Sequence, residues 1–244
     1  MIKAIVFDLD NTLMDFLARK EKSIDAAINA MHDAGLNISF KKIKKEIYKI
    51  YDTGFNVEDQ LVFQKFLKKY KKEDDLKLIA KAVFAYRRIK QAETHTYPQV
   101  RNVLLQIIKR KIPIGIVSDG PKLSVWIRLT ELGIDDFFDF VIAFDDTGAN
   151  KSTDVPFTKV KTLLKYRPED VLFVGDWPER DIFGAKRNGF KSCFAAYGYY
   201  GRSLPRRVTQ KEISAIIKKY KPDYVLNKFS DILNVLGKEN KWRN

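Results

Sequence analysis

Short apolar segments separated by helical patterns restrict the fold of this chain more than any other feature of its sequence. We expect buried strands at residues 3–7, 112–117, 140–143, 171–174, 192–195 and 224–226. Helices are expected at residues 98–111, 121–133, 160–166, 178–188 and 230–236. Apolar strands that alternate with helices are typical of a parallel sheet covered by helices on both faces. The sequence therefore predicts an α/β fold with a Rossmann-like parallel sheet.

A long helical insert interrupts this pattern after the first strand. Between residues 15 and 96 the apolar residues recur at helical spacing, as in Ile24, Ala27, Ile28 and Met31, and no strand pattern occurs. We therefore expect an α/β core of residues 1–14 and 97–236 and an inserted α-helical domain of residues 15–96. The polar tail 237–244 is expected to be loosely structured.

Two scarce residue types exclude several classes of protein. The single cysteine, Cys193, cannot form a disulfide within the chain, which excludes a disulfide scaffold and Cys-rich zinc modules. Its place in an apolar strand favours a small buried residue. The histidines, His32 and His95, lie in separate helical patterns, so a histidine-based metal site is not expected.

The chain is strongly basic, with 45 Lys and Arg against 31 Asp and Glu and a net charge of +14. This balance permits attraction to nucleic acid, anionic lipid or phosphorylated metabolites, but lysine-rich helix faces in contact with water are the favoured explanation. No apolar run reaches the roughly 20 residues needed to span a bilayer. The N-terminal segment does not resemble a signal peptide. We expect a cytoplasmic protein without a membrane partner, as a monomer or homodimer.

Polar residues follow the predicted strands where each strand ends. Asp8 and Asp10 follow the first, Ser118 and Asp119 the second, Lys151 lies beyond the third, and Asp176 and Asp181 follow the fourth. In parallel sheets, ligands bind beyond the carboxyl ends of the strands. Converging carboxylates repel one another, and a hard divalent cation such as Mg²⁺ relieves that repulsion. Lysine is a suitable point charge for phosphate.

Two carboxylates at positions i and i+2 can share the work of phosphoryl transfer. One can attack phosphorus to form an aspartyl-phosphate, while the other protonates the leaving oxygen and later activates water. Each residue also has a simpler interpretation. The Asp8–Asp10 pair could be the polar end of a strand, Ser118 a helix cap, and Lys151 a solvated charge. Asp181 could support the first turn of its helix, and Asp145 and Asp146 are expected to be turn residues.

The order of these residues resembles the haloacid dehalogenase (HAD) superfamily. Asp8-Leu9-Asp10-Asn11-Thr12 resembles its motif I, Ser118 motif II, Lys151 motif III, and Gly175-Asp176 with Asp181 motif IV. The helical insert lies where the family carries its C1-type cap. Two departures occur: proline does not follow Lys151 directly, and Trp177 stands where the family often has a small polar residue.

The resemblance implies a role for each motif residue. Asp8 would be the nucleophile and a metal ligand, and Asp10 the general acid/base and a ligand through its carbonyl oxygen. Asp176 would bind Mg²⁺, and Asp181 would do so directly or through water. Phosphate-binding residues would be Thr12, which also steadies the turn, Ser118, Asp119 and Lys151. The dehalogenase and phosphonatase branches lack an aspartate at the position of Asp10, so its presence favours a phosphatase.

The sequence therefore predicts a Mg²⁺-dependent phosphatase acting on a small phosphorylated metabolite. A phosphomutase of the same fold, and a basic nucleic-acid-binding protein with an idle site, are the alternatives. Candidate substrate contacts are Phe16, Arg19, Lys20, Trp177 and the segment 53–56. The aromatic and basic loop 197–202, with Arg206 and Arg207, could hold a nucleic-acid strand, but an ordinary loop beside the site is favoured.

Overall fold

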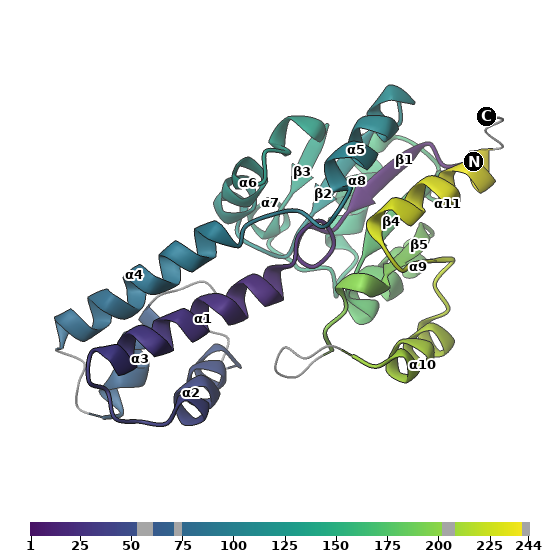
Figure 1. Cartoon of the computed structure of the whole chain (residues 1–244). Coiled ribbons are helices and arrows are strands. Elements are labelled where there is room, and N and C mark those ends of the chain that lie inside the picture. The colour runs from purple at the N-terminus through teal and green to yellow at the C-terminus, as the bar shows by residue number, and fades with distance from the viewer. Residues whose placement is uncertain (53–60, 71–74, 202–207, 241–244) are drawn as a thin grey trace. The chain divides into compact units, whose positions relative to one another are not determined.

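The computed structural model describes residues 1–52, 61–70, 75–201 and 208–240, which divide into two compact units (Figure 1). An α/β unit contains residues 1–16, 94–201 and 208–240, and a helical unit contains residues 17–52, 61–70 and 75–93. The chain thus leaves the α/β unit two residues after the predicted boundary at residue 14 and re-enters it three residues before residue 97.

A six-stranded parallel sheet forms the centre of the α/β unit. Its strands are β1 (Ala4–Phe7), β2 (Ile114–Val117), β3 (Phe140–Ile142), β4 (Val171–Gly175), β5 (Lys191–Ala195) and β6 (Tyr224–Leu226). The spatial order is β3-β2-β1-β4-β5-β6, so successive strands are added on one side of β1 and then on the other. Such a reversal opens a crevice at the carboxyl ends of β1 and β4, where doubly wound sheets bind ligands.

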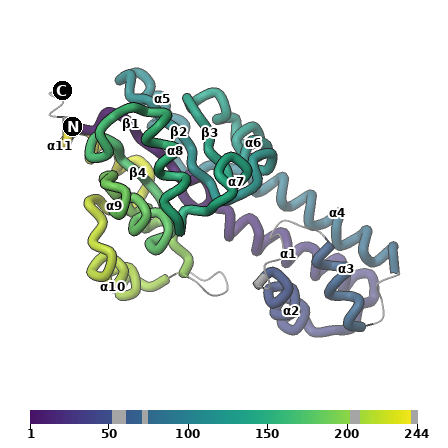
Figure 2. The backbone as a smooth tube through the Cα atoms, turned by 180° about the vertical axis from the view of Figure 1, so that it is seen from behind, coloured from purple at the N-terminus to yellow at the C-terminus, as the bar shows by residue number. Residues whose placement is uncertain are grey.

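Helices cover both faces of this sheet, as the sequence predicted (Figure 2). Ile5 and Phe7 of β1 belong to one apolar core with residues of α5 (Val100–Lys109), α6 (Lys122–Glu131) and α11 (Ile232–Asn240). Ala4 and Val6 belong to the opposite core with residues of α8 (Val155–Leu164) and α9 (Phe183–Arg187). Because alternate strand residues point to opposite faces, a four-residue strand buried throughout requires both layers.

The helical unit has an apolar core of its own. It contains α1 (Phe16–Asp33), α2 (Phe40–Asp52), α3 (Leu61–Lys68) and α4 (Leu76–Ala92). The core includes Ile28 from the predicted apolar stripe, together with Ile47, Phe63 and Leu78, each almost fully buried. This unit therefore buries apolar surface independently of the sheet.

Several elements differ from the sequence-based expectation. Helix α10 (Gln210–Tyr220) was not predicted, although Thr209 and Glu212 form a reciprocal capping box at its start. Helix α11 continues to Asn240, so the expected loose tail at 237–240 is helical. The helix expected at 178–188 begins with a π-helical turn, Pro178–Ile182, before α9. A short helix, α7 (Phe144–Thr147), contains the aspartates expected in a turn.

Candidate active site

The carboxyl ends of β1, β2 and β4 position the motif residues. Asp8 directly follows β1, and its amide still donates to the Val174 carbonyl of β4 at 2.8 Å. Ser118 follows β2 and donates its amide to the Ile142 carbonyl of β3 at 2.9 Å. Asp176 follows β4. All three are almost fully buried, so the sheet itself fixes their main-chain positions in the crevice.

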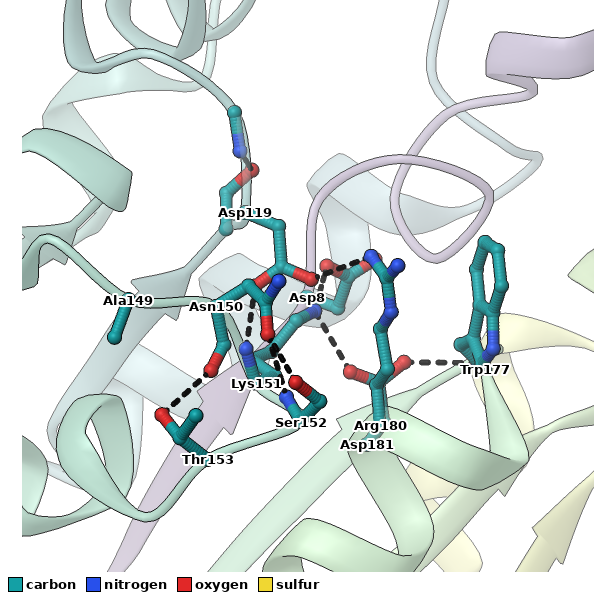
Figure 3. Close-up of polar contacts among 12 residues, drawn as sticks. Asp8, Asp119, Ala149, Asn150, Lys151, Ser152, Thr153, Trp177, Arg180 and Asp181 are labelled. Carbon is teal, nitrogen blue, oxygen red and sulfur yellow. Dashed lines mark hydrogen bonds and ion pairs between the residues drawn. The ribbon is translucent and has the colours of Figure 1, made fainter. Parts of the chain in front are cut away.

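Lys151 joins the carboxylates of two different motifs (Figure 3). Its Nζ pairs with Asp8 Oδ1 and lies 2.7 Å from Asp181 Oδ1. The other oxygen of Asp8 accepts a hydrogen bond from the Thr12 hydroxyl at 3.2 Å. Gly175 makes room for this arrangement, because a Cβ at that position would lie 2.3 Å from the Asp181 carboxyl carbon. Lysine, nucleophile candidate and motif IV are thus in direct contact.

Asp8, Asp176 and Asp181 form a cluster that could hold a metal ion. One carboxylate oxygen from each lies within 4.8 Å of the other two, and all three residues are buried. Within the described residues, this is the group of His, Cys, Asp and Glu side chains that meets this geometric condition. Clustered carboxylate oxygens are the ligands that Mg²⁺ prefers.

The electrostatics of the cluster call for additional positive charge. Burial, followed by the charges of Asp181 and Asp10, raises the pKa of Asp8 to about 7 against the opposing effect of Lys151. Burial and the charges of Asp8 and Asp181 raise the pKa of Asp176 well above its usual value. Burial alone would lower the pKa of Lys151, but the charges of Asp181 and Asp8 raise it well above its usual value, which keeps the lysine charged. When all three carboxylates are ionised, the cluster with the Lys151 ammonium carries a net charge of −2. One divalent cation would balance that charge, so the residues present fit a metal such as Mg²⁺.

The loop after β1 holds Asp10 beside a buried arginine. Asn11 adopts a positive φ of 59°, and the amides of Thr12 and Leu13 donate back to the Leu9 carbonyl at 3.3 and 2.9 Å. This tight turn returns the chain so that Asp10 Oδ2 lies 3.4 Å from Nη1 of Arg128. Arg128 comes from α6, is 4% exposed, and stacks over the Phe16 ring at 5.6 Å. Sequence analysis did not identify Arg128.

The second and third motifs are joined through Asp119. Its Oδ1 accepts the backbone amide of Lys151 at 2.8 Å, and its Oδ2 pairs with Arg180 Nη1 at 2.9 Å (Figure 3). The Ser118 hydroxyl accepts the amide of Gly120 at 3.2 Å. Because a carboxylate repels phosphate, a phosphate contact from Asp119 would have to come from its main chain. The phosphate-binding roles of these residues stay predictions.

The predicted substrate residues lie in different surroundings. Trp177 is 39% exposed and stacks on Arg180, whose guanidinium carbon is 4.5 Å from the ring centroid. Phe16 is buried beneath Arg128. Arg19 and Lys20 belong to α1 of the helical unit, where the Lys20 ammonium lies 3.9 Å from the centroid of Tyr51. Substrate contact by these residues stays a prediction.

Other candidate residues have structural partners or fall outside the described residues. Asp145 accepts the Lys122 backbone amide and so caps α6, and Asp146 pairs with the Lys122 ammonium at 2.6 Å. Segment 53–56, Arg202, Arg206 and Arg207 lie outside the described residues.

A turn after β5, in the segment that sequence analysis expected to be a loop beside the site, packs against the loop that carries Asp10. The Tyr197 hydroxyl donates to the Thr12 carbonyl at 2.7 Å, and its ring meets Tyr97 edge-on with centroids 4.9 Å apart. Gly198 approaches so closely that a Cβ there would lie 1.6 Å from the Asn11 carbonyl oxygen. The glycine and tyrosine in Tyr197-Gly198-Tyr199 were the only signal of this contact.

Among the residues that the structure describes, no helix is long and apolar enough to cross a membrane.

Comparison with known proteins identifies the family. A sequence model described as haloacid dehalogenase-like hydrolase matches residues 2–189, and a second HAD-like model matches residues 149–232. A glyceraldehyde 3-phosphate phosphatase of Pyrococcus furiosus is 31% identical over 98% of this chain and 95% of its own length. A pyrophosphatase of Bacillus thuringiensis, PpaX, is 26% identical over 98% of this chain and 99% of its own.

Solved structures share the fold at lower identity. The HAD hydrolase YfnB of Bacillus subtilis, solved bound to magnesium, superimposes with a TM-score of 0.64 at 20% identity, over 97% of this chain and 99% of that one. A 2-haloacid dehalogenase of Pseudomonas syringae gives a TM-score of 0.60 at 19% identity, over 98% and 100%. The family match over most of the sequence confirms the expectation from the four motifs: the chain belongs to the haloacid dehalogenase-like hydrolases.

Proposed function

We propose that this protein is a Mg²⁺-dependent phosphatase that hydrolyses a small phosphomonoester through an aspartyl-phosphate on Asp8. The observation that carries the proposal is the cluster of Asp8, Asp176 and Asp181 at the carboxyl edge of the sheet, where the Lys151 ammonium contacts Asp8 and Asp181. The presence of Asp10 two residues after Asp8 adds the acid that an alkoxide leaving group needs.

The metal would be held by Asp8 and Asp176, with Asp181 binding it directly or through water. When bound, Mg²⁺ supplies positive charge against the oxygens of the phosphoryl group. Lys151 already contacts Asp8, so its ammonium would also lie against a phosphoryl group attacked by that carboxylate. The Thr12 hydroxyl, bonded to Asp8 Oδ2, would fix the orientation of the carboxylate during attack.

The reaction would proceed in two steps that share the same residues. In the first, an oxygen of Asp8 bonds to phosphorus, the bond from phosphorus to the leaving oxygen breaks, and Asp10 donates its proton to that oxygen. In the second, Asp10 takes a proton from water, and the resulting hydroxide attacks phosphorus. This releases inorganic phosphate and restores the Asp8 carboxylate. Arg128, 3.4 Å from Asp10, would hold the carboxyl group of Asp10 in place.

The relatives suggest which substrates to test first. Several archaeal relatives are named glyceraldehyde 3-phosphate phosphatase, at 29–33% identity. A three-carbon phosphate ester is therefore the first candidate. Pyrophosphate is the second, since it is the substrate named for PpaX.

The decisive experiment measures phosphate release from p-nitrophenyl phosphate, glyceraldehyde 3-phosphate and pyrophosphate, each with Mg²⁺ and with a chelator. We expect Mg²⁺-dependent release by the native protein and at least a ~10³-fold loss in Asp8→Asn, because the amide is not a nucleophile. The matched control is Asp136→Asn, an exposed aspartate in the turn Asp135–Phe137 before β3.

Two results would contradict the proposal. Full activity in Asp8→Asn would exclude Asp8 as the nucleophile. Transfer of phosphate between positions of a sugar phosphate, with little release to water, would indicate a mutase instead.

A further inference from the structure

Lys151 is held at its main chain as well as at its ammonium group. The side chain contacts Asp8 and Asp181, while its backbone amide donates to Asp119 at 2.8 Å (Figure 3). Asp119 in turn receives Arg180 Nη1 at 2.9 Å. Lys151 lies between α7 and α8, outside any helix or strand. Contacts from these side chains therefore hold it in place instead of the hydrogen bonds of a helix or strand.

Two of the contacts that hold Lys151 lead to consecutive residues of one turn. Asp181 reaches the ammonium, and Arg180 reaches the main chain through Asp119. These residues lie in the π-helical turn Pro178–Ile182. Such turns are rare and often occur at functional sites. The turn is fixed at its start, because Asp181 Oδ2 accepts the Trp177 amide at 2.8 Å.

Trp177 orders the arginine. The Arg180 guanidinium lies 4.5 Å from the centroid of the indole ring, and both side chains remain more than a third exposed. An exposed arginine would otherwise sample many rotamers, and stacking on an aromatic face restricts them. The guanidinium on the indole ring donates from Nη1 to Asp119 Oδ2 at 2.9 Å.

The location of the Asp119–Arg180 pair argues against a role in stability alone. Partly exposed ion pairs contribute little to the free energy of unfolding. This pair instead joins the end of β2, the Lys151 loop and the turn after β4.

We propose that Arg180, ordered by Trp177, is a positioning residue that fixes the main chain at Lys151 through Asp119 and so aligns the lysine with the phosphoryl group. The inference rests on the proposed function. In it, Trp177 acts through Arg180 and not as a substrate contact.

The test compares Arg180→Gln, Arg180→Lys, Asp119→Asn and the Asp119→Asn/Arg180→Gln double variant. For Arg180→Gln we expect kcat/KM on p-nitrophenyl phosphate to fall about tenfold or more, with KM raised and kcat lowered, because small displacements of a catalytic group are costly. Arg180→Lys should recover part of the loss. The double variant should lose no more than the worse single variant, since both changes break one chain of contacts.

Two further measurements separate positioning from general damage. Mg²⁺ affinity, measured by calorimetry, should stay within about twofold of native in Arg180→Gln, because the carboxylate cluster is intact. Trp177→Ala should weaken activity in the native background but cost nothing further in Arg180→Gln. The matched control is Arg167→Gln, an arginine 70% exposed that pairs with Asp170 before β4, which should retain native kinetics.

Additive losses in the double variant, or native kcat/KM in Arg180→Gln, would overturn the inference. A further loss from Trp177→Ala in the Arg180→Gln background would overturn the role given to Trp177. Calorimetric binding of inorganic phosphate in the presence of Mg²⁺ tests the inference separately from the proposed function. If the native protein hydrolyses no ester but Arg180→Gln weakens phosphate binding, the proposed function fails and the positioning role stands.

Discussion

Asp170 is a single buried carboxylate whose partners lie at the amino edge of the sheet, away from the candidate active site. It is 2% exposed and lies 3.0 Å from Lys3 Nζ and 3.2 Å from Arg167 Nε. Its own carbonyl accepts the Lys3 amide at 2.7 Å. The hydrogen bond from Lys3, with help from Arg167, lowers the pKa of Asp170 below its usual value.

This lowered pKa predicts how stability depends on pH. The folded state favours the ionised carboxylate more than the unfolded state does. The contribution of Asp170 to stability is therefore complete above its unfolded pKa of about 3.9, and it is lost as pH falls through its lower pKa in the folded state. Asp170→Asn should therefore lower the free energy of unfolding by about 1 kcal/mol at neutral pH. The difference from native should shrink in denaturant titrations below about pH 4. The control is Glu169→Gln, whose side chain is 57% exposed. A difference independent of pH would contradict the assignment.

Single residues also show where sequence reasoning succeeds and where it ends. Asp8, Asp176, Asp181 and Lys151 could be predicted to converge because each follows a strand of one parallel sheet, and strand ends share an edge. Arg128 could not, because a basic residue within an amphipathic helix has the same pattern whether it points to water or to a carboxylate. The sequence likewise contains no sign that Asp119 would contact both Lys151 and Arg180.

At the scale of secondary-structure elements, the strands could be predicted from the sequence, because short apolar runs between turn residues indicate buried strands in an α/β chain. The boundaries of the helices were harder to predict. Helix α8 begins at Val155, five residues before the predicted start, since Pro156 fits a first helical turn. The π-helical turn at Pro178–Ile182 leaves the apolar spacing of a helix nearly unchanged. Its detection requires coordinates.

The contact between the turn Ala196–Gly198 and the loop after β1 predicts a large effect from a small change. In Gly198→Ala the new Cβ would meet the Asn11 carbonyl, so one of the two segments must move. We expect a lower thermal midpoint and at least a ~tenfold loss of kcat, since Asp10 and Thr12 share the displaced loop. Gly237→Ala in α11 is the matched control: nothing lies within 4 Å of its added Cβ. It should be neutral or stabilising by about 0.5–1 kcal/mol. Native activity in Gly198→Ala would show that this contact does not position the loop.

Over the entire molecule, the charge of the candidate site is opposite in sign to the net charge of the chain. The protein carries a net +14, yet the crevice at the centre of the sheet gathers buried carboxylates. A basic surface would attract an anionic substrate, whereas the cluster itself would repel one until a cation is bound. Composition alone could therefore favour nucleic acid as easily as a phosphate ester, and only the motif order separated the two.

If Mg²⁺ binds the buried cluster as proposed, the thermal stability of the protein should depend on the metal. In the native protein, Mg²⁺ at a hundred times its dissociation constant should stabilise by about 2.7 kcal/mol and raise the thermal midpoint by about 5–10 °C. Asp176→Asn removes one of three mutually repelling buried carboxylates while keeping the side-chain shape. In a chelator this variant should melt higher than native, because burying an uncompensated charge is costly.

Added Mg²⁺ should then produce little further shift in the melting of Asp176→Asn, and phosphate release should be lost. Asp136→Asn, with its exposed side chain, should respond to Mg²⁺ as the native protein does. Calorimetric scans of the three proteins, each with chelator and with Mg²⁺, give both comparisons. If Asp176→Asn responds to Mg²⁺ as strongly as the native protein does, the stabilising ion binds elsewhere. If Asp176→Asn instead melts lower than native in chelator, the hydrogen bonds of the cluster carboxylates stabilise the fold by more than their mutual repulsion destabilises it.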